Sequence, residues 1–244
     1  MLKIKTVLKL GPKTKDEEYD RRKNEMKTLG SAMRAYKSAM ERAKSSMKRV
    51  VETWADVRKA FDALSDDVNV PDSTRDCTLA LTASMDRIEG SLLPEYMTVM
   101  DSNVIPATSE LSSLYDECGK LENSRNKLMH EYDVYRNEVA KKESEYQRKS
   151  KDISTSKSYG SEVAKRDRLE ADFGEADQKF KDTHAHLMQN RAIACSAALY
   201  AFVDCSATFM EGVASEFTAL KGSSQQALQA VRYGAQMEYN TPND

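Results

Sequence analysis

The sequence has 244 residues, of which 40% are apolar and 31% charged, and it contains only 9 Gly and 5 Pro. So few turn-forming residues exclude a fold of many short strands. The longest uncharged stretch, residues 192–203, is shorter than the roughly 18 apolar residues that span a bilayer, and no apolar run near the N-terminus resembles a secretory signal. The composition therefore predicts a mostly helical, soluble and intracellular protein.

The formal net charge is −2, but the charges are unevenly distributed. Residues 1–15 carry five lysines and no acid, and residues 141–166 carry eight basic residues and four acidic ones. Residues 167–244 carry 6 basic and 11 acidic residues. The two basic segments favour a partner with a negatively charged surface, whereas a pI near 6.0 argues against nonspecific nucleic-acid binding.

The first long apolar pattern predicts a helix over residues 16–64. Apolar side chains recur at alternating spacings of three and four from Met26 to Leu64, which is typical of a coiled-coil seam. Thr14 is a candidate N-cap, acidic residues fill the first turn, and Pro71 lies beyond the end. We expect this helix to pack lengthwise against its neighbours.

Two further helices are predicted. The second covers about residues 75–152 and should be kinked at Pro94 and Pro106, because proline removes an amide donor from the helix. Residues 153–161 are a predicted turn, and the third helix follows it and fades after about Tyr233. The sequence thus predicts an all-α fold, an elongated, kinked, antiparallel three-helix coiled coil.

The third helix contains a band, Ala192 to Met210, that is apolar nearly all round. Such a band is wider than two neighbouring helices can cover. We therefore expect a homodimer that forms along it, with Cys195, Ala198, Phe202 and Phe209 at the interface.

Arg125 falls at a core position of the second helix's apolar pattern. A charge there is costly unless it is paired. Either Arg125 sets the register of the dimer, or its side chain snorkels to the edge of the bundle.

Several short motifs resemble amphiphysin-type BAR domains. Residues 5–11 (Lys-Thr-Val-Leu-Lys-Leu-Gly) and 14–19 (Thr-Lys-Asp-Glu-Glu-Tyr) are similar to the start of that family's domain. Residues 104–106 (Val-Ile-Pro) resemble its kink-forming proline. Residues 125–128 (Arg-Asn-Lys-Leu), followed by Tyr and Asp at 132–133, resemble a stretch of its second helix.

The resemblance extends over about residues 3–225 and implies an N-BAR protein. Such a protein is a crescent-shaped homodimer whose basic concave face and tips bind anionic, curved membrane. The implied organisation is an amphipathic membrane-inserting segment at 1–12, a BAR domain at 13–233 and a flexible C-terminal tail at 234–244.

Two groups of residues are expected at the membrane. If residues 2–10 form a helix, apolar and basic side chains fall on separate sides, as in an interfacial helix, and Ile4, Val7 and Leu8 insert. The alternatives for this segment are a disordered basic tail or a strand of alternating apolar and basic residues. The second group surrounds the turn between the second and third helices, and its alternative is a solvated helix end with paired charges. The expected membrane-binding residues are Lys3, Lys5, Lys9, Lys127, Arg136, Lys141, Lys142, Arg148, Lys149, Lys151, Lys157, Lys165 and Arg166.

No catalytic motif is present among the serine-hydrolase, phosphate-loop or dinucleotide-binding patterns, so we expect no catalytic residue, metal site or cofactor. The leading hypothesis is a non-enzymatic module that senses or generates curvature and tubulates membranes, in endocytosis or vesicle trafficking. Its expected partners are anionic phospholipids, phosphoinositides among them, and a second copy of the chain, but no nucleic acid. It would be cytoplasmic and peripheral to the membrane. The alternative is a coiled-coil dimeric scaffold for a protein such as a small GTPase.

Overall fold

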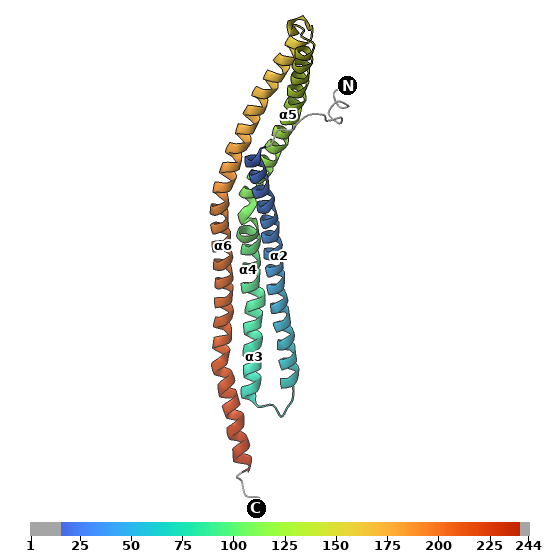
Figure 1. Ribbon diagram of the computed structural model, residues 1–244. Coiled ribbons are helices and arrows are strands. Elements are labelled where there is room, and N and C mark those ends of the chain that lie inside the picture. The colour runs from blue at the N-terminus through green and yellow to red at the C-terminus, as the bar shows by residue number, and fades with distance from the viewer. Residues whose placement is uncertain (1–15, 240–244) are drawn as a thin grey trace, which may run out of the picture. The chain divides into compact units, whose positions relative to one another are not determined.

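The computed structural model describes residues 16–239, with side chains described up to Tyr233, and its long elements are all helices (Figure 1). The chain divides into two compact units. In the described part, unit 1 comprises residues 16–33 and 109–194, and unit 2 comprises residues 34–108 and the chain from residue 195 onward. The prediction of an all-α fold with three long helices is confirmed.

Helix α2 (Glu17–Ser65) matches the first predicted helix to within one residue at each end. Its N-cap is Asp16, whose Oδ1 accepts a hydrogen bond from the amide of Tyr19 at 2.9 Å. Glu17, Glu18 and Asp20 place acidic side chains in the first turn, where they interact favourably with the helix dipole. Thr14, the cap expected from the sequence, lies outside the described residues.

The second predicted helix is divided into segments of different helical geometry. In chain order they are α3 (Asp72–Arg87), the π-helical η1 (Ile88–Leu92), α4 (Leu93–Val99), the π-helical η2 (Met100–Val104), the 3-10 turn η3 (Ile105–Thr108) and α5 (Ser109–Arg148). The irregular stretches lie beside the two predicted proline positions.

Proline explains where the regular hydrogen-bond pattern is lost. Pro94 cannot donate to the carbonyl four residues earlier, and in η1 the amide of Leu93 donates to Ile88, five residues back. In η2 the same five-residue pattern recurs ahead of Pro106. The positions predicted for kinks therefore coincide with departures from α-helical hydrogen bonding.

The connection between α5 and α6 is a short turn at one end of unit 1 (Figure 1). It contains the 3-10 turn η4 (Ile153–Thr155), and the amide of Ser154 donates to Asp152 Oδ1 at 2.9 Å. Helix α6 runs from Tyr159 to Tyr239, six residues past the predicted end of its pattern. Residues 240–244, part of the predicted flexible tail, lie outside the described residues, as does the predicted amphipathic segment 1–12.

The core of unit 1 forms where α2, α5 and α6 meet. Its buried members are Tyr19, Met26 and Leu29 from α2, Leu111 and Cys118 from α5, and Phe180 and Leu187 from α6. Several of these side chains are seven residues apart, which puts them on one face of their helix. The heptad pattern read from the sequence is therefore what closes this core.

The core of unit 2 is centred on the irregular helical stretch. Ile88, Met100 and Val104 are fully buried there, and Val51 of α2 and Cys205, Phe209 and Val213 of α6 pack around them. The rings of Tyr96 and Phe209 have centroids 4.9 Å apart. The π-helical segments thus contribute three fully buried side chains to the core between α2 and α6.

Gly30 permits a close approach of α2 to α5 within unit 1. A Cβ atom at Gly30 would lie 2.6 Å from Tyr115 Oη and 2.8 Å from its Cζ. A Cβ atom at Gly174, which is also in a helix, would meet no atom within 4 Å. The two glycines therefore form a matched pair for testing the packing.

We expect Gly30→Ala to destabilise the protein by about 1–3 kcal/mol, because the Tyr115 ring must move out of a packed position. Gly174→Ala should instead stabilise it by about 0.5–1 kcal/mol, because alanine loses less backbone entropy than glycine in a helix. Urea denaturation of both variants measures the difference. Equal stabilisation by both substitutions would contradict the close approach.

Candidate functional site

Arg125 of α5 is completely buried in unit 1. Its Nε donates to Asp177 Oδ1 of α6 at 2.8 Å, and its Nη2 pairs with Oδ2 of Asp16 at the start of α2. The guanidinium carbon lies 4.0 Å from the ring centroid of Tyr19 and 5.1 Å from that of Phe173. Arg125 therefore connects all three helices of unit 1, and its side chain does not snorkel to the edge of the bundle.

This arrangement shifts the pKa values of ionisable groups around Arg125. Burial by itself would raise the pKa of Asp177, but hydrogen bonds from Lys181 and Arg125 outweigh it and hold that pKa below its usual range. Burial raises the pKa of Tyr19 to about 12, and the Tyr19 hydroxyl donates to Glu122 Oε1 at 2.7 Å. At neutral pH the network therefore contains an ionised Asp177 and an uncharged Tyr19.

His184 is a second buried polar group of unit 1, at 4% exposure. Its Nε2 lies 3.3 Å from Glu25 Oε2, yet among the described residues neither this atom nor the buried Nη1 of Arg22 has a hydrogen-bond partner. Burial lowers the pKa of His184, which keeps its imidazole uncharged at neutral pH. Within residues 16–233, no group of three His, Cys, Asp or Glu side chains is arranged to hold a metal ion.

The α5–α6 turn lies at the end of unit 1 where these helices join (Figure 1), and the basic residues expected around it come from the end of α5, the connection and the start of α6. Lys141, Arg148, Lys151, Lys157 and Lys165 are exposed. We name these five residues the basic turn. They are positioned by the ends of two packed helices and by the short connection between them, so several like charges share one small region.

Other expected membrane-binding residues form ion pairs instead. The pairs are Lys142 with Glu162, Lys149 with Glu145, Arg166 with Asp167 at 2.6 Å, and Arg136 with Asp133 at 3.0 Å. Lys127 is exposed farther back along α5, away from the turn. Lys3, Lys5, Lys9, Ile4, Val7 and Leu8 lie outside the described residues. The ion-paired residues fit the interpretation of a solvated helix end, whereas the five exposed residues of the basic turn fit a basic surface. Both interpretations therefore apply, to different residues of the same region.

The residues predicted for a dimer interface have different locations in unit 2. Ala198 and Phe209 are 4% and 3% exposed and are buried inside the unit, and Phe202 is partly buried against the same core. Cys195 is exposed. The inner face of α6 uses Ala198 and Phe209 for packing within the chain, and the dimer interface stays a prediction.

A different face of α6 is both apolar and exposed. Leu199, Val203, Met210, Phe217 and Leu228 are 39–63% exposed. At 100° per residue they fall within an arc of about 40°, so they form one line along the helix. We name these five residues the α6 stripe.

Helix α2 has a similar line of exposed apolar residues in unit 2. Val50, Val57, Phe61 and Leu64 are 41–73% exposed, although the sequence pattern predicted them in a packed seam. We name them the α2 stripe. Among the exposed large apolar side chains of the described part, only Ile193 belongs to unit 1. The exposed apolar surface of the described residues is therefore concentrated in unit 2.

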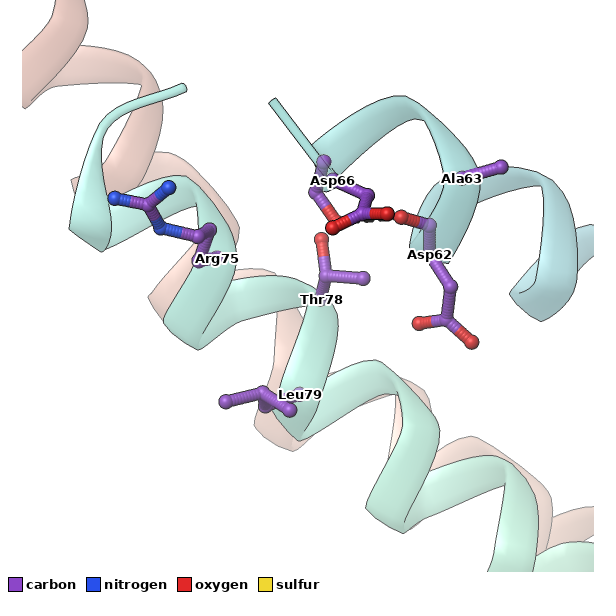
Figure 2. A pocket seen from close by; sticks show the side chains of 7 residues that line it. Asp62, Ala63, Asp66, Arg75, Thr78 and Leu79 are labelled. Carbon is purple, nitrogen blue, oxygen red and sulfur yellow. Dashed lines mark hydrogen bonds between the residues drawn. The ribbon is translucent and has the colours of Figure 1, made fainter. Parts of the chain in front are cut away.

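Two hollows lie near the junction of α2 and α3. The larger, of about 640 Å³, is mainly apolar and includes Phe61 of the α2 stripe and Leu228 of the α6 stripe. Figure 2 shows the smaller, of about 460 Å³, where Asp62 of α2 and Asp66 just after it lie opposite α3, which contributes Arg75. The larger hollow continues the two apolar stripes, whereas the smaller one has charged side chains in its lining.

Helix α6 also contains an apolar window long enough to cross a membrane, with a mean hydropathy of 1.5 and only 17% of its residues buried. A helix in the core of a soluble protein would be mostly buried. However, Asp204, Thr208 and Glu211 are exposed on another side of the same region. Charged side chains such as Asp204 and Glu211 are costly inside a bilayer, so lateral packing against a partner is favoured over a membrane span.

The site expected from the sequence did not include a basic stretch of α2. Residues 21–49 carry ten basic and two acidic residues, a net charge of +8. In unit 2, Lys37, Arg42, Lys48 and Arg49 of this stretch are exposed. A charge count over the middle of the helix would have found it, but the acidic residues at both ends of α2 conceal it in a coarser count.

No protein-family model matches this chain, and no curated protein is significantly similar to it.

We expect Arg125→Met to lower the free energy of unfolding by about 3–5 kcal/mol, because it removes the buried partner of both Asp16 and Asp177 and leaves Asp177 with Lys181 as its remaining counter-charge. Arg168→Met is the matched control. Arg168 has a 77% exposed side chain that lies 3.9 Å from Asp172. Its loss should change stability by less than about 0.5 kcal/mol. Urea denaturation at pH 7 measures both effects.

The Arg125 effect should also depend on pH. Because the pKa of Asp177 is lowered in the folded state, the stability it contributes is present above its unfolded pKa and is lost as the pH falls through the folded one. The difference between the wild type and Arg125→Met should therefore shrink in acid. An Arg125→Met variant as stable as Arg168→Met would contradict the network.

Proposed function

We propose that this chain is a non-enzymatic module that binds anionic membrane as a homodimer and senses or generates curvature, as its resemblance to amphiphysin-type BAR domains implies. One observation carries the proposal: the exposed apolar side chains are concentrated in unit 2, whereas the basic turn lies in unit 1. Association and membrane contact thus have separate surfaces. The proposal places the protein in the cytoplasm, at endocytic or vesicular membranes.

The two stripes support association with a second copy. Soluble monomers seldom expose long contiguous apolar surfaces, because covering such surfaces is favourable. The residues of each stripe recur at spacings built from three and four, which suits packing against another helix along its length. A two-fold dimer covers the same surface on both chains at once.

The basic turn supports contact with anionic lipid. A Lys or Arg near an anionic leaflet contributes on the order of 1 kcal/mol, so five exposed residues give a useful attraction even when only some of them make contact. Two copies in one dimer strengthen binding further through avidity. The basic stretch of α2 and the lysine-rich segment 1–15 would add to the same attraction.

A dimeric scaffold that binds a protein partner, such as a small GTPase, is the alternative function. The larger apolar hollow and the α6 stripe favour it, because both could receive a helix of another protein. This alternative predicts a dimer with weak lipid binding that is insensitive to charge at the basic turn.

The first test concerns the α6 stripe. Val203→Arg should shift the protein from a dimer towards the 27.5 kDa monomer, because a dimer would bury the new charge without a partner. Thr208→Arg is the control, since Thr208 is also exposed on α6 but lies outside the stripe, and this variant should remain a dimer. Light scattering at micromolar concentration gives the masses. A monomeric wild type would refute the dimer.

The second test concerns the basic turn. Reversal of Lys141, Arg148 and Lys151 to Glu should greatly reduce co-sedimentation with vesicles rich in anionic lipid, while the fold survives because all three side chains are exposed. Reversal of Lys59, Lys120 and Lys179, each exposed among acidic residues, changes the total charge equally and should have little effect. Wild-type binding should also weaken as salt increases. Undiminished binding by the folded turn variant would favour the scaffold.

A further inference from the structure

Helix α5 ends in a Schellman motif centred on Ser150. The amide of Lys151 donates to the carbonyl of Tyr146 at 3.0 Å, and the amide of Ser150 donates to that of Gln147 at 3.1 Å. Ser150 has a φ of 49°, and no other non-glycine residue of the described chain has a positive φ. Glycine fits this left-handed position with the least strain, so the serine side chain is retained at a cost to stability.

The hydroxyl of Ser150 makes no hydrogen bond within the described residues that would compensate for this cost. Three nearby hydroxyl groups have partners within the fold: Ser154 Oγ donates to Asp152 at 2.7 Å, Thr155 Oγ1 donates to the Asp152 carbonyl at 2.7 Å, and Ser158 Oγ accepts from Lys142 at 2.7 Å. The hydroxyl of Ser156 has no such partner among the described residues. Between residues 16 and 233, no hydrogen bond involves the Ser150 hydroxyl. Its role should therefore be sought outside the folding of the turn.

The surroundings of Ser150 suggest that role. The residue is exposed, and it has Arg148 and Lys149 before it and Lys151 after it. The connection from residue 149 to 158 is mostly exposed and has only one short 3-10 turn, so few packed contacts oppose its extension in a kinase active site. We propose that Ser150 is a phosphorylation site for a serine kinase that selects basic flanking residues, and that phosphorylation releases the basic turn from anionic membrane.

Phosphorylation of Ser150 needs only ATP as a co-reactant. Ser150 Oγ forms a bond to the γ-phosphorus, the bond from that phosphorus to the ADP oxygen breaks, and the hydroxyl proton is released. The phosphate adds a charge of about −1.5 to −2 at pH 7. Residues 141–166 carry eight basic and four acidic residues, so one phosphate cancels a large part of their excess positive charge. This regulatory role rests on the proposed membrane function.

A pair of substitutions isolates the charge from the backbone effect. Asp and Asn both tolerate left-handed backbone and differ by one charge, so Ser150→Asp should bind anionic vesicles several-fold more weakly than Ser150→Asn. Circular dichroism and light scattering should show that both variants remain folded and have the same mass. Equal vesicle binding by the two variants would overturn the switch.

The modification itself is tested on the full chain with ATP, Mg²⁺ and an active kinase of the basic-directed class. Mass spectrometry should find phosphate on Ser150, and the modified protein should bind vesicles of anionic lipid at least about ten-fold more weakly than the unmodified one. Ser150→Gly, which keeps the cap but lacks the hydroxyl, should bind vesicles and should lose none of that binding after kinase treatment.

The outcomes separate this inference from the proposed function. If the unmodified protein binds vesicles but Ser150 is not phosphorylated, or its phosphorylation leaves binding unchanged, the switch is refuted and the membrane function stands. If the unmodified protein does not bind anionic vesicles at all, the proposed function fails and the switch falls with it.

Discussion

A long helix can bury apolar side chains only against other helices that lie alongside it, and this constraint governs unit 2. Helix α6 buries one face there through Cys205, Phe209 and Val213, while the α6 stripe is largely exposed among the described residues, although Phe217 also packs edge-to-face against Trp54 of α2. The α2 stripe is exposed in the same unit. In the proposed dimer, the stability of unit 2 in water would be linked to an intermolecular contact, because association removes apolar surface that folding alone leaves exposed.

The helices of unit 1 are held together by a different kind of interaction. A fully buried arginine, Arg125, is held between Asp16 and Asp177 and beneath the ring of Tyr19. Such a network is weak evidence for stability, because desolvation offsets much of the attraction between the charges. Its geometry, however, requires one particular alignment of α2, α5 and α6, since a shift of one residue would leave a buried charge unpaired. The network therefore specifies the register of the three helices in unit 1. Unit 1 also exposes little apolar surface, and its end carries the exposed charges of the basic turn.

Sequence periodicity predicted the helices well and the roles of their faces poorly. Proline chemistry located the irregular stretches beside Pro94 and Pro106, because a missing amide donor acts locally. A heptad pattern, by contrast, does not state whether the partner helix belongs to the same chain. Phe209 was therefore assigned to a dimer interface although it is buried in unit 2, and Val203 was not assigned although it is exposed. The partners of Arg125 lie 52 and 109 residues away in the sequence, beyond the reach of any local pattern.

In the basic turn, too, the sequence alone does not show which charged residues are paired. A charge count treats Lys141 and Lys142 alike, but Lys142 pairs with Glu162 across the turn and thereby ties α5 to α6, whereas Lys141 is exposed. Ion pairs of this kind fix the end of the unit and leave the neighbouring cations available to an anionic surface. In the proposed membrane contact, the part of the attraction that comes from the turn depends on these exposed cations, so a phosphate at Ser150 would weaken that part directly. The position of Ser150 among the cations, and not the net charge of the chain, is what makes this residue suited to such control.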